Sequence, residues 1–327
     1  MMRMLQATSI TLLLLATTSL QARTDALEDA AREVQNGKLR FLFAARAGVW
    51  GDGGSVLIMH PGEVPEDDHG WRGRYEPGPV RVTLTLRDAE VVRVKRQVGG
   101  RWGTAPRGTR DLGSVPALLA SQFLMTLAFE GHGQVAEDAL AAAVLAAGVD
   151  HTPQLRRLAG DRERPLDVRK SAIFWFARSD AEGVAQDLVA WIRARREPRE
   201  IREHAVFALS QRPQEESVAP LLAVARDHEV SREVRKQAVF WLGQAVGDAV
   251  TADLNAFVRD DDEDVEIRKH AVFALSQRPA DQSVPALLRV ARSAAHPELR
   301  ESAIFWLSQV DDPRVVDFFE EILFQEE

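Results

Sequence analysis

The chain has no cysteine among its 327 residues, and this absence limits its chemistry. Without thiols it can form no disulfide, use no thiolate nucleophile and carry no lipid on a cysteine. The Gly-x-Ser-x-Gly and His-Glu-x-x-His signatures of hydrolases are also missing. The sequence therefore predicts neither a catalytic constellation nor a cofactor, and stability has to come from buried apolar surface.

Long apolar runs are scarce as well. Ile10–Ala16 is the centre of an N-terminal stretch that follows Arg3 and ends in small residues before Arg23, as in a secretory signal. We predict a signal peptide at 1–22 and an exported protein, periplasmic or secreted. No other run approaches the ~20 residues of a membrane-spanning helix. Nucleic acid is not an expected partner, because the sequence pI is about 5.6.

One helical sequence motif, which we call the phrase, occurs five times, in residues 168–178, 201–211, 234–244, 267–277 and 299–309. The copies start 33, 33, 33 and 32 residues apart. Positions 1, 5, 8 and 9 of the phrase are apolar and fall on one helical face. An acidic residue precedes each copy and suits the first turn of a helix. A fixed period of this size is typical of stacked repeats that bury their apolar faces against each other.

Shorter amphipathic segments lie between the phrases. Residues 217–226 and 283–292 are similar to each other, and we expect Ser217 and Ser283 to cap their helices. Ser114 opens a related segment, and residues 181–194, 249–259 and 313–324 fill the equivalent places. The pattern predicts about six helix pairs from residue 114 and a lone C-terminal helix.

The phrases resemble HEAT repeats, in particular the short HEAT-like repeats of phycobilisome lyases. The resemblance rests on the apolar-Arg opening, as in Val168-Arg169 and Ile201-Arg202, and on alanine at position 5 with leucine at position 9. It covers about residues 114–327. It implies a mainly α fold, a right-handed α-solenoid of about six HEAT-like pairs whose phrase helices line the concave side. The family serves mostly as protein-binding scaffolds, so the resemblance implies no chemistry.

Position 7 departs from the usual pattern, because it is phenylalanine in every copy: Phe174, Phe207, Phe240, Phe273 and Phe305. On a helical wheel this position points away from the apolar stripe. The rings then form an exposed row typical of a contact site. The alternative, equally open at this point, is that repeat curvature buries the rings in a thicker core.

Polar groups flank this row at positions 4 and 11. They include His204, His270, Gln211, Gln244 and Gln277. Amide and imidazole groups beside rings suit an extended peptide or a glycan. Position 8 alternates between tryptophan and alanine, and we interpret this alternation as interdigitating core layers.

The N-terminal part has a period of two. Residues 38–46, 55–60, 72–75, 80–87 and 91–98 read as strands after a short helix at 24–37, with a hairpin turn at 88–90. They predict a small antiparallel β domain, for which no family is recognised. We divide the chain into the signal at 1–22, the β-rich domain at 23–110 and the solenoid at 111–327.

Charge differs between these parts. Residues 38–110 contain 13 Lys/Arg and 8 Asp/Glu, a net charge of +5, whereas residues 111–327 contain 25 and 37, a net charge of −12. Solubility and attraction within the chain explain this difference most simply. The β domain could alternatively bind an anionic envelope polymer. The acidic run at 260–264 has the alternating oxygens of a calcium loop but lacks the turn glycine, so we expect a solvated loop and no metal.

We therefore expect an exported, non-enzymatic scaffold that binds a protein or extended peptide outside the cytoplasm through the phenylalanine row. One alternative is an envelope structural protein that holds anionic polymer on its β domain. The other is a lyase-like, chromophore-handling enzyme, by analogy with lyases that carry similar repeats.

Overall fold

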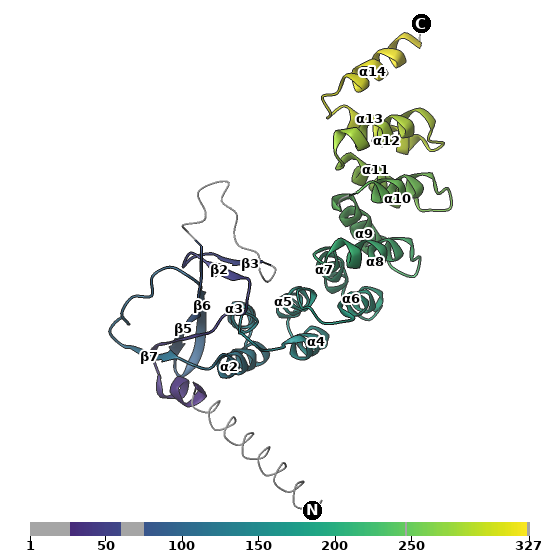
Figure 1. Cartoon of the computed structure of the whole chain (residues 1–327). Helices are drawn as coiled ribbons and strands as arrows, with labels where there is room; N and C mark the ends of the chain where they lie inside the picture. Colours follow the sequence, from purple (N-terminus) through teal and green to yellow (C-terminus); the bar gives the residue numbers. More distant parts are fainter. Residues whose placement is uncertain (1–26, 60–74, 246, 326–327) are drawn as a thin grey trace, which may run out of the picture. The chain divides into compact units, whose positions relative to one another are not determined.

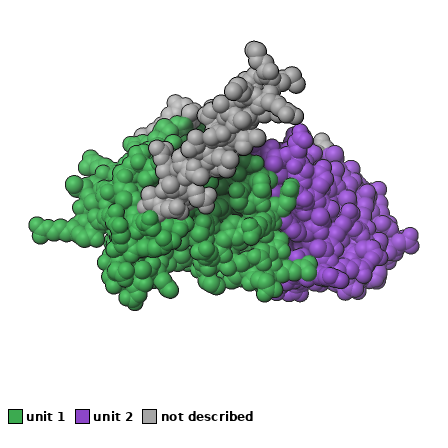
Figure 2. Space-filling model, turned by 90° about the horizontal axis from the view of Figure 1, so that it is seen from below, with its two compact units in different colours: residues 1–175 green, residues 176–327 purple. Residues whose placement is uncertain are grey.

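The computed structural model describes residues 27–59, 75–245 and 247–325 (Figure 1). The predicted signal at 1–22 lies outside these residues, as does most of the strand expected at 72–75. The chain divides into two compact units, with the boundary between Trp175 and Phe176 (Figure 2). Among the described residues, no helix is both long and apolar enough to cross a membrane.

The first unit begins with a helical turn at 27–33 and continues into two sheets. The larger sheet has the order β6-β5-β1-β7 and the smaller one β3-β2-β4. The strands are β1 (Gly37–Phe43), β2 (Val49–Gly51), β3 (Val56–Ile58), β4 (Glu76–Pro77), β5 (Val80–Arg87), β6 (Glu90–Gln97) and β7 (Thr109–Ser114). The β5–β6 hairpin turns at Asp88 and Ala89, whose φ angles of 50° and 64° match the twist of the strands. This hairpin was predicted.

Alternation along the strands creates one apolar face on the larger sheet. Leu39, Phe41 and Phe43 of β1 are fully buried, as are the inward residues of β5. Helices α2 (Ala117–Glu130) and α3 (Gly133–Ala143) cover this face, and the Phe123 ring meets Phe41 edge-on at 6.3 Å. The β region is thus antiparallel except where β7 pairs in parallel with β1.

The rest of the chain consists of paired helices, as the period predicts. The remaining helices are α4 (Thr152–Gly160), α5 (Leu166–Ala177), α6 (Val184–Arg193), α7 (Arg199–Ser210), α8 (Gln214–Arg226), α9 (Arg232–Gln244), α10 (Asp248–Arg259), α11 (Val265–Ser276), α12 (Ala280–Ser293), α13 (Pro297–Leu307) and α14 (Pro313–Gln325). In the described chain α2 to α13 make six pairs, and α14 follows alone. The prediction of six pairs is confirmed.

The serine caps were predicted wrongly. Ser217 and Ser283 are buried inside α8 and α12, which begin three residues earlier, directly after Pro213 and Pro279. The proline fixes φ before the first turn, and the acidic residues that follow it suit the positive end of the helix dipole. Ser114 caps no helix either, because it ends β7.

The arginine at position 2 of the phrase ties four of the six pairs together. The Nε of Arg169, Arg202, Arg235 and Arg268 donates to a carbonyl ten residues back, at 2.8, 2.7, 2.7 and 3.0 Å. These carbonyls belong to the last turn of the preceding helix, where no backbone partner exists. A buried guanidinium therefore satisfies the negative end of one helix from the first turn of the next. This contact explains the apolar-Arg opening.

In the second unit the phrase helices α7, α9, α11 and α13 lie side by side in one row (Figure 1). They pack together more closely than α6, α8, α10 and α12 of the other row. Adding a Cβ at Gly243 would place it 2.8 Å from the Cβ of Ala274, so α9 and α11 approach as near as a glycine permits. Closer packing indicates that the phrase row forms the inner side of this unit.

Candidate binding surface

Six aromatic rings form a continuous surface along the phrase row of the second unit. Phe207 of α7 meets Trp241 of α9 at a centroid distance of 5.3 Å, and Trp241 meets Phe240 at 5.0 Å. Phe240 stacks on Phe273 of α11 at 6.0 Å. Phe273 then meets Trp306 of α13 at 5.0 Å, and Trp306 meets Phe305 at 4.9 Å. We call these six residues the aromatic row.

The rings lie between core and solvent. Each phrase helix buries positions 1 and 5 of its apolar stripe completely, for example Val234 and Ala238 of α9. The rings of Phe207, Phe240 and Phe273 are half-buried, and Phe305 is 56% exposed. They rest on one another and leave one side open. Neither expectation for position 7 therefore describes the whole row.

The tryptophans do not fill the core as interpreted from the sequence. Trp241 and Trp306 are half-buried members of the aromatic row, whereas Ala208 and Ala274 at the same phrase position are fully buried. The small alanines leave room for the indoles of the next helix. Each indole therefore contacts the phenylalanine of the preceding phrase helix, Trp241 with Phe207 and Trp306 with Phe273. The alternation itself was the available signal for two surface residues that the sequence interpretation missed.

The glutamines lie where they were expected, beside the rings. Gln211 and Gln277 are exposed, and each Nε2 donates to the preceding serine Oγ at 3.2 and 3.1 Å. Gln244 is exposed and follows Gly243, so it has no such serine and makes no hydrogen bond to a described residue. The three side chains supply amide groups along one edge of the row.

The histidines flank the other edge. The ring of His204 lies 5.5 Å from Phe207. Burial lowers the pKa of His270, and the Lys236 charge lowers it further. Lys236 pairs with Glu233 at 3.3 Å, and Lys269 bridges Glu266 and Glu298 at 3.1 Å each. The surroundings of the row are therefore polar but carry little net charge.

Phe174, the remaining predicted site residue, belongs to the first unit. Its half-buried ring meets Trp175 edge-on at 5.3 Å. The geometry described above therefore brings together nine of the ten predicted residues, without Phe174.

A second surface lies on the larger sheet of the first unit. In the register, Thr83 pairs with Arg40 and Lys95, and Thr85 pairs with Lys38 and Arg93. Directly paired residues share a face, here the one opposite the buried core. Arg40 is held by Asp111 at 2.6 Å and by the Trp102 ring at 4.6 Å. Lys38, Arg93 and Lys95 are exposed and form no ion pair with a described residue. We call these three the sheet cations.

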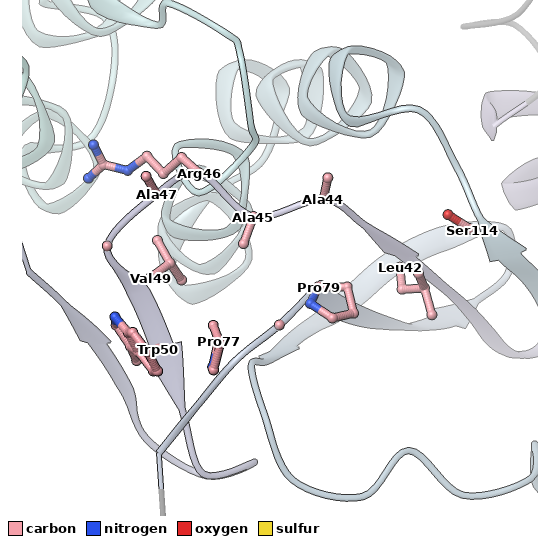
Figure 3. Close-up of a pocket in the computed structure, with 12 residues that line it drawn as sticks. Leu42, Ala44, Ala45, Arg46, Ala47, Val49, Trp50, Pro77, Pro79 and Ser114 are labelled. Atoms are coloured by element: carbon pink, nitrogen blue, oxygen red, sulfur yellow. The ribbon is translucent and has the colours of Figure 1, made fainter. Parts of the chain in front are cut away.

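The first unit also contains cavities. One of about 680 Å³ lies between the end of β1, β2 and the segment at 77–79. Figure 3 shows its largely apolar lining, including Val49, Trp50 and Pro77, with the Arg46 side chain pointing away from the other labelled groups. Its lining contains one cation, Arg46, and one hydroxyl, Ser114, with no carboxylate or histidine.

A larger cavity of about 900 Å³ has a polar pair in its wall. Ser121 of α2 lies with its Oγ 2.5 Å from Nε2 of His151, and both residues are buried. Burial lowers the pKa of His151 to about 4, with the Arg46 charge adding to the effect and Asp150 opposing it. A neutral imidazole and a hydroxyl satisfy each other here. The sequence interpretation did not identify this pair.

The His151 environment predicts acid sensitivity. An unfolded histidine titrates near 6.5 and the folded one near 4, so the unfolded chain binds a proton that the folded chain excludes. This contribution to stability is present above pH 6.5 and is lost as the pH falls to 4, by about 3 kcal/mol. We expect urea unfolding at pH 7 and pH 4 to show this loss, and His151→Gln to reduce it. Changing the exposed His228 to Gln should leave the stability loss between pH 7 and pH 4 unchanged. If His228→Gln reduces that loss as much as His151→Gln does, the assignment to His151 is wrong.

The comparison with known protein families agrees with the repeat architecture. Residues 254–327 match the family model for HEAT repeats, which confirms the predicted resemblance for this part of the chain. Human deoxyhypusine hydroxylase, solved with glycerol, is 19% identical over 63% of this chain and 80% of its own, with a TM-score of 0.32. Escherichia coli YibA is 17% identical over 64% of this chain and 79% of its own, with a TM-score of 0.34. No curated protein matches.

Proposed function

We propose that this HEAT-repeat protein is a non-enzymatic binding scaffold that holds an extended segment of a partner protein along the aromatic row. The observation that carries the proposal is the unbroken ring surface over four helices, open on one side and flanked by amides and imidazoles. Monomeric proteins seldom leave so many large rings accessible in one place without a partner. Tryptophan in particular is enriched among residues that dominate binding energy.

The row suits a protein segment through its polar groups as well. Neither indole N–H of Trp241 and Trp306 donates to a described residue, so both can donate to ligand carbonyls. The exposed glutamines can donate or accept. Since charges nearby are paired, specificity would come from shape and hydrogen bonds, and binding should depend weakly on salt.

The compartment belongs to the same proposal. An exported protein with a signal at 1–22 would meet partners in the periplasm or the medium. Detection of the mature N-terminus in an extracytoplasmic fraction supports this location, and an intact N-terminus confined to the cytoplasm refutes it. Absorbance of natively purified protein tests the alternative of a chromophore-handling enzyme, which requires a visible band.

Peptide display tests the binding function. A library of random 16-residue peptides is panned on the wild type and on a variant with Phe207→Ser, Phe240→Ser and Phe273→Ser. We expect enrichment on the wild type that disappears on the variant, provided that circular dichroism shows the variant folded. If it unfolds, Gln244→Glu with Gln277→Glu serves instead, because both positions are exposed, and the carboxylates lack the amide donor and cost free energy to desolvate against a neutral segment. Equal enrichment on a folded variant would refute the proposal.

The sheet cations support a second candidate function, binding of an anionic polymer. Three cations that form no ion pair with described residues share one face with the threonines of β5. Such a surface attracts polyanions through charge alone, whatever their monomer sequence. We expect dextran sulfate to bind while neutral dextran does not. Arg93→Ser with Lys95→Ser should weaken this binding about 30-fold, at about 1 kcal/mol for each cation near an anionic surface.

The control for the sheet variant removes the same number of positive charges from another part of the chain. Arg196→Ser with Arg259→Ser removes two exposed cations from the second unit. Salt titration of dextran sulfate binding should separate the two variants. If both lose affinity to the same extent, net charge and not the sheet face is responsible.

A further inference from the structure

Within the aromatic row, one arrangement of rings occurs twice. Phe207 and Trp241 are tilted by 48° with centroids 5.3 Å apart, and Phe273 and Trp306 by 43° at 5.0 Å. Each pair joins the phenylalanine of one helix to the tryptophan of the next, and we call such a tilted pair a notch. Between the notches, Phe240 stacks on Phe273 with an interplanar angle of only 12°. The row therefore consists of two notches joined by one nearly parallel pair, Phe240 and Phe273, which we call the platform.

We propose, on the basis of the binding function above, that the segment held here is proline-rich and adopts the polyproline II conformation. Packed helices lie about 8–10 Å apart, so the two notches, separated by two helices, lie about 16–20 Å apart. A polyproline II helix rises about 3.1 Å per residue with three residues per turn, so six residues span about 19 Å. Prolines at i and i+6 would enter the two notches, and a proline at i+3 would lie on the platform.

Peptides in the other regular conformations do not match the spacing between successive phrase helices. Residues on one face of a β-strand recur every ~6.7 Å, and turns of an α-helix every 5.4 Å. Neither distance matches a spacing of about 9 Å, so their side chains would fall out of phase with successive helices. A polyproline II turn of about 9.3 Å matches it directly.

The chemistry of the row agrees with the geometry. Pyrrolidine rings are apolar and rigid, and aromatic-lined grooves are the recurring receptors of such segments. The carbonyls of polyproline II have no internal partners, and the indole N–H groups of Trp241 and Trp306 can donate to them. A glycan would instead present many hydroxyls to the protein, and the rings are flanked by few polar groups that could bond them.

Fluorescein-labelled (Pro-Pro-Gln)4 is the direct probe, read by fluorescence anisotropy with the full-length mature protein. The spacing control is (Pro-Pro-Gln-Gln)3, which has the same length but a period of four, and the flexibility control is (Gly-Gly-Gln)4. We expect (Pro-Pro-Gln)4 to bind at least tenfold more tightly than either control. We also expect Trp241→Ala with Trp306→Ala to remove that preference, in a variant whose circular dichroism is native.

The outcomes separate this inference from the binding function. Equal affinity for the period-three and period-four peptides overturns the polyproline assignment, as does display enrichment of row-dependent peptides without prolines three residues apart. In the second case the binding function stands. If neither display nor anisotropy finds a peptide whose binding depends on the aromatic row, both the polyproline assignment and the peptide-binding function are refuted. Binding of cellohexaose at the row would then identify the row as a glycan site. Should the double alanine variant not fold, Gln244→Glu with Gln277→Glu provides the same comparison.

Discussion

Replacing Arg235 with alanine should lower the free energy of unfolding by about 3–5 kcal/mol. The Arg235 side chain is 5% exposed, and it pairs with Glu263, which is 2% exposed. It also donates to the carbonyl of Ala225 at 2.7 Å. Truncation leaves a buried carboxylate and an unsatisfied helix end, and both are costly. Urea unfolding followed by far-ultraviolet circular dichroism measures the loss.

The chain offers a matched control on the same helix. Arg232 pairs with Asp264 at 2.6 Å, with side chains 56% and 29% exposed. Exposed pairs contribute less than about 1 kcal/mol, so Arg232→Ala should be nearly neutral. Replacing both Arg235 and Glu263 with methionine should recover part of the loss, because no charge then stays buried. Similar costs for Arg232→Ala and Arg235→Ala would contradict this account.

Trp241→Ala should reduce the affinity for the most enriched display peptide about 30-fold, or about 2 kcal/mol. Trp241 meets both Phe207 and Phe240, so its removal opens the middle of the aromatic row. Isothermal titration calorimetry gives the affinity of each variant. Leu323→Ala is the control, since this apolar side chain on α14 is exposed and lies outside the row. An equal loss in that control would show that the row is not the site.

Local periodicity explains why the helical part was predictable. Each phrase repeats the same apolar stripe, and each helix pair packs mainly on the neighbouring pairs. The positions of α5, α7, α9, α11 and α13 therefore follow from the sequence alone. The acidic residues in the first turns, such as Glu200 and Glu266, were also where expected. The same holds for the hairpin at Asp88, whose strands are adjacent in sequence.

Features that depend on distant contacts were not predictable. No strand was predicted at β7, because only its pairing with β1, about 70 residues earlier, makes it a strand. Trp241 fits a core position by its phrase number, but its half-buried ring lies against Phe207 of the neighbouring helix α7. The Ser121–His151 pair likewise joins two segments with no shared pattern.

The acidic run at 260–264 shows how a pattern can have several structural uses. Asp264 accepts from the Glu266 amide and caps α11, at 2.9 Å. Glu263 holds Arg235, and Asp261 pairs with Arg268 at 2.9 Å. The expected solvated loop is thus only partly solvated, because its carboxylates also anchor the phrase arginines on either side.

Photo-crosslinking locates the ligand on the molecule most directly. The most enriched display peptide is synthesised with a benzophenone side chain at its centre, irradiated with wild-type protein and mapped by mass spectrometry. The account predicts crosslinks to α7, α9, α11 and α13 near the aromatic row, suppressed by unlabelled peptide. Crosslinks that instead gather on α8, α10 and α12, or on the larger sheet, would contradict it.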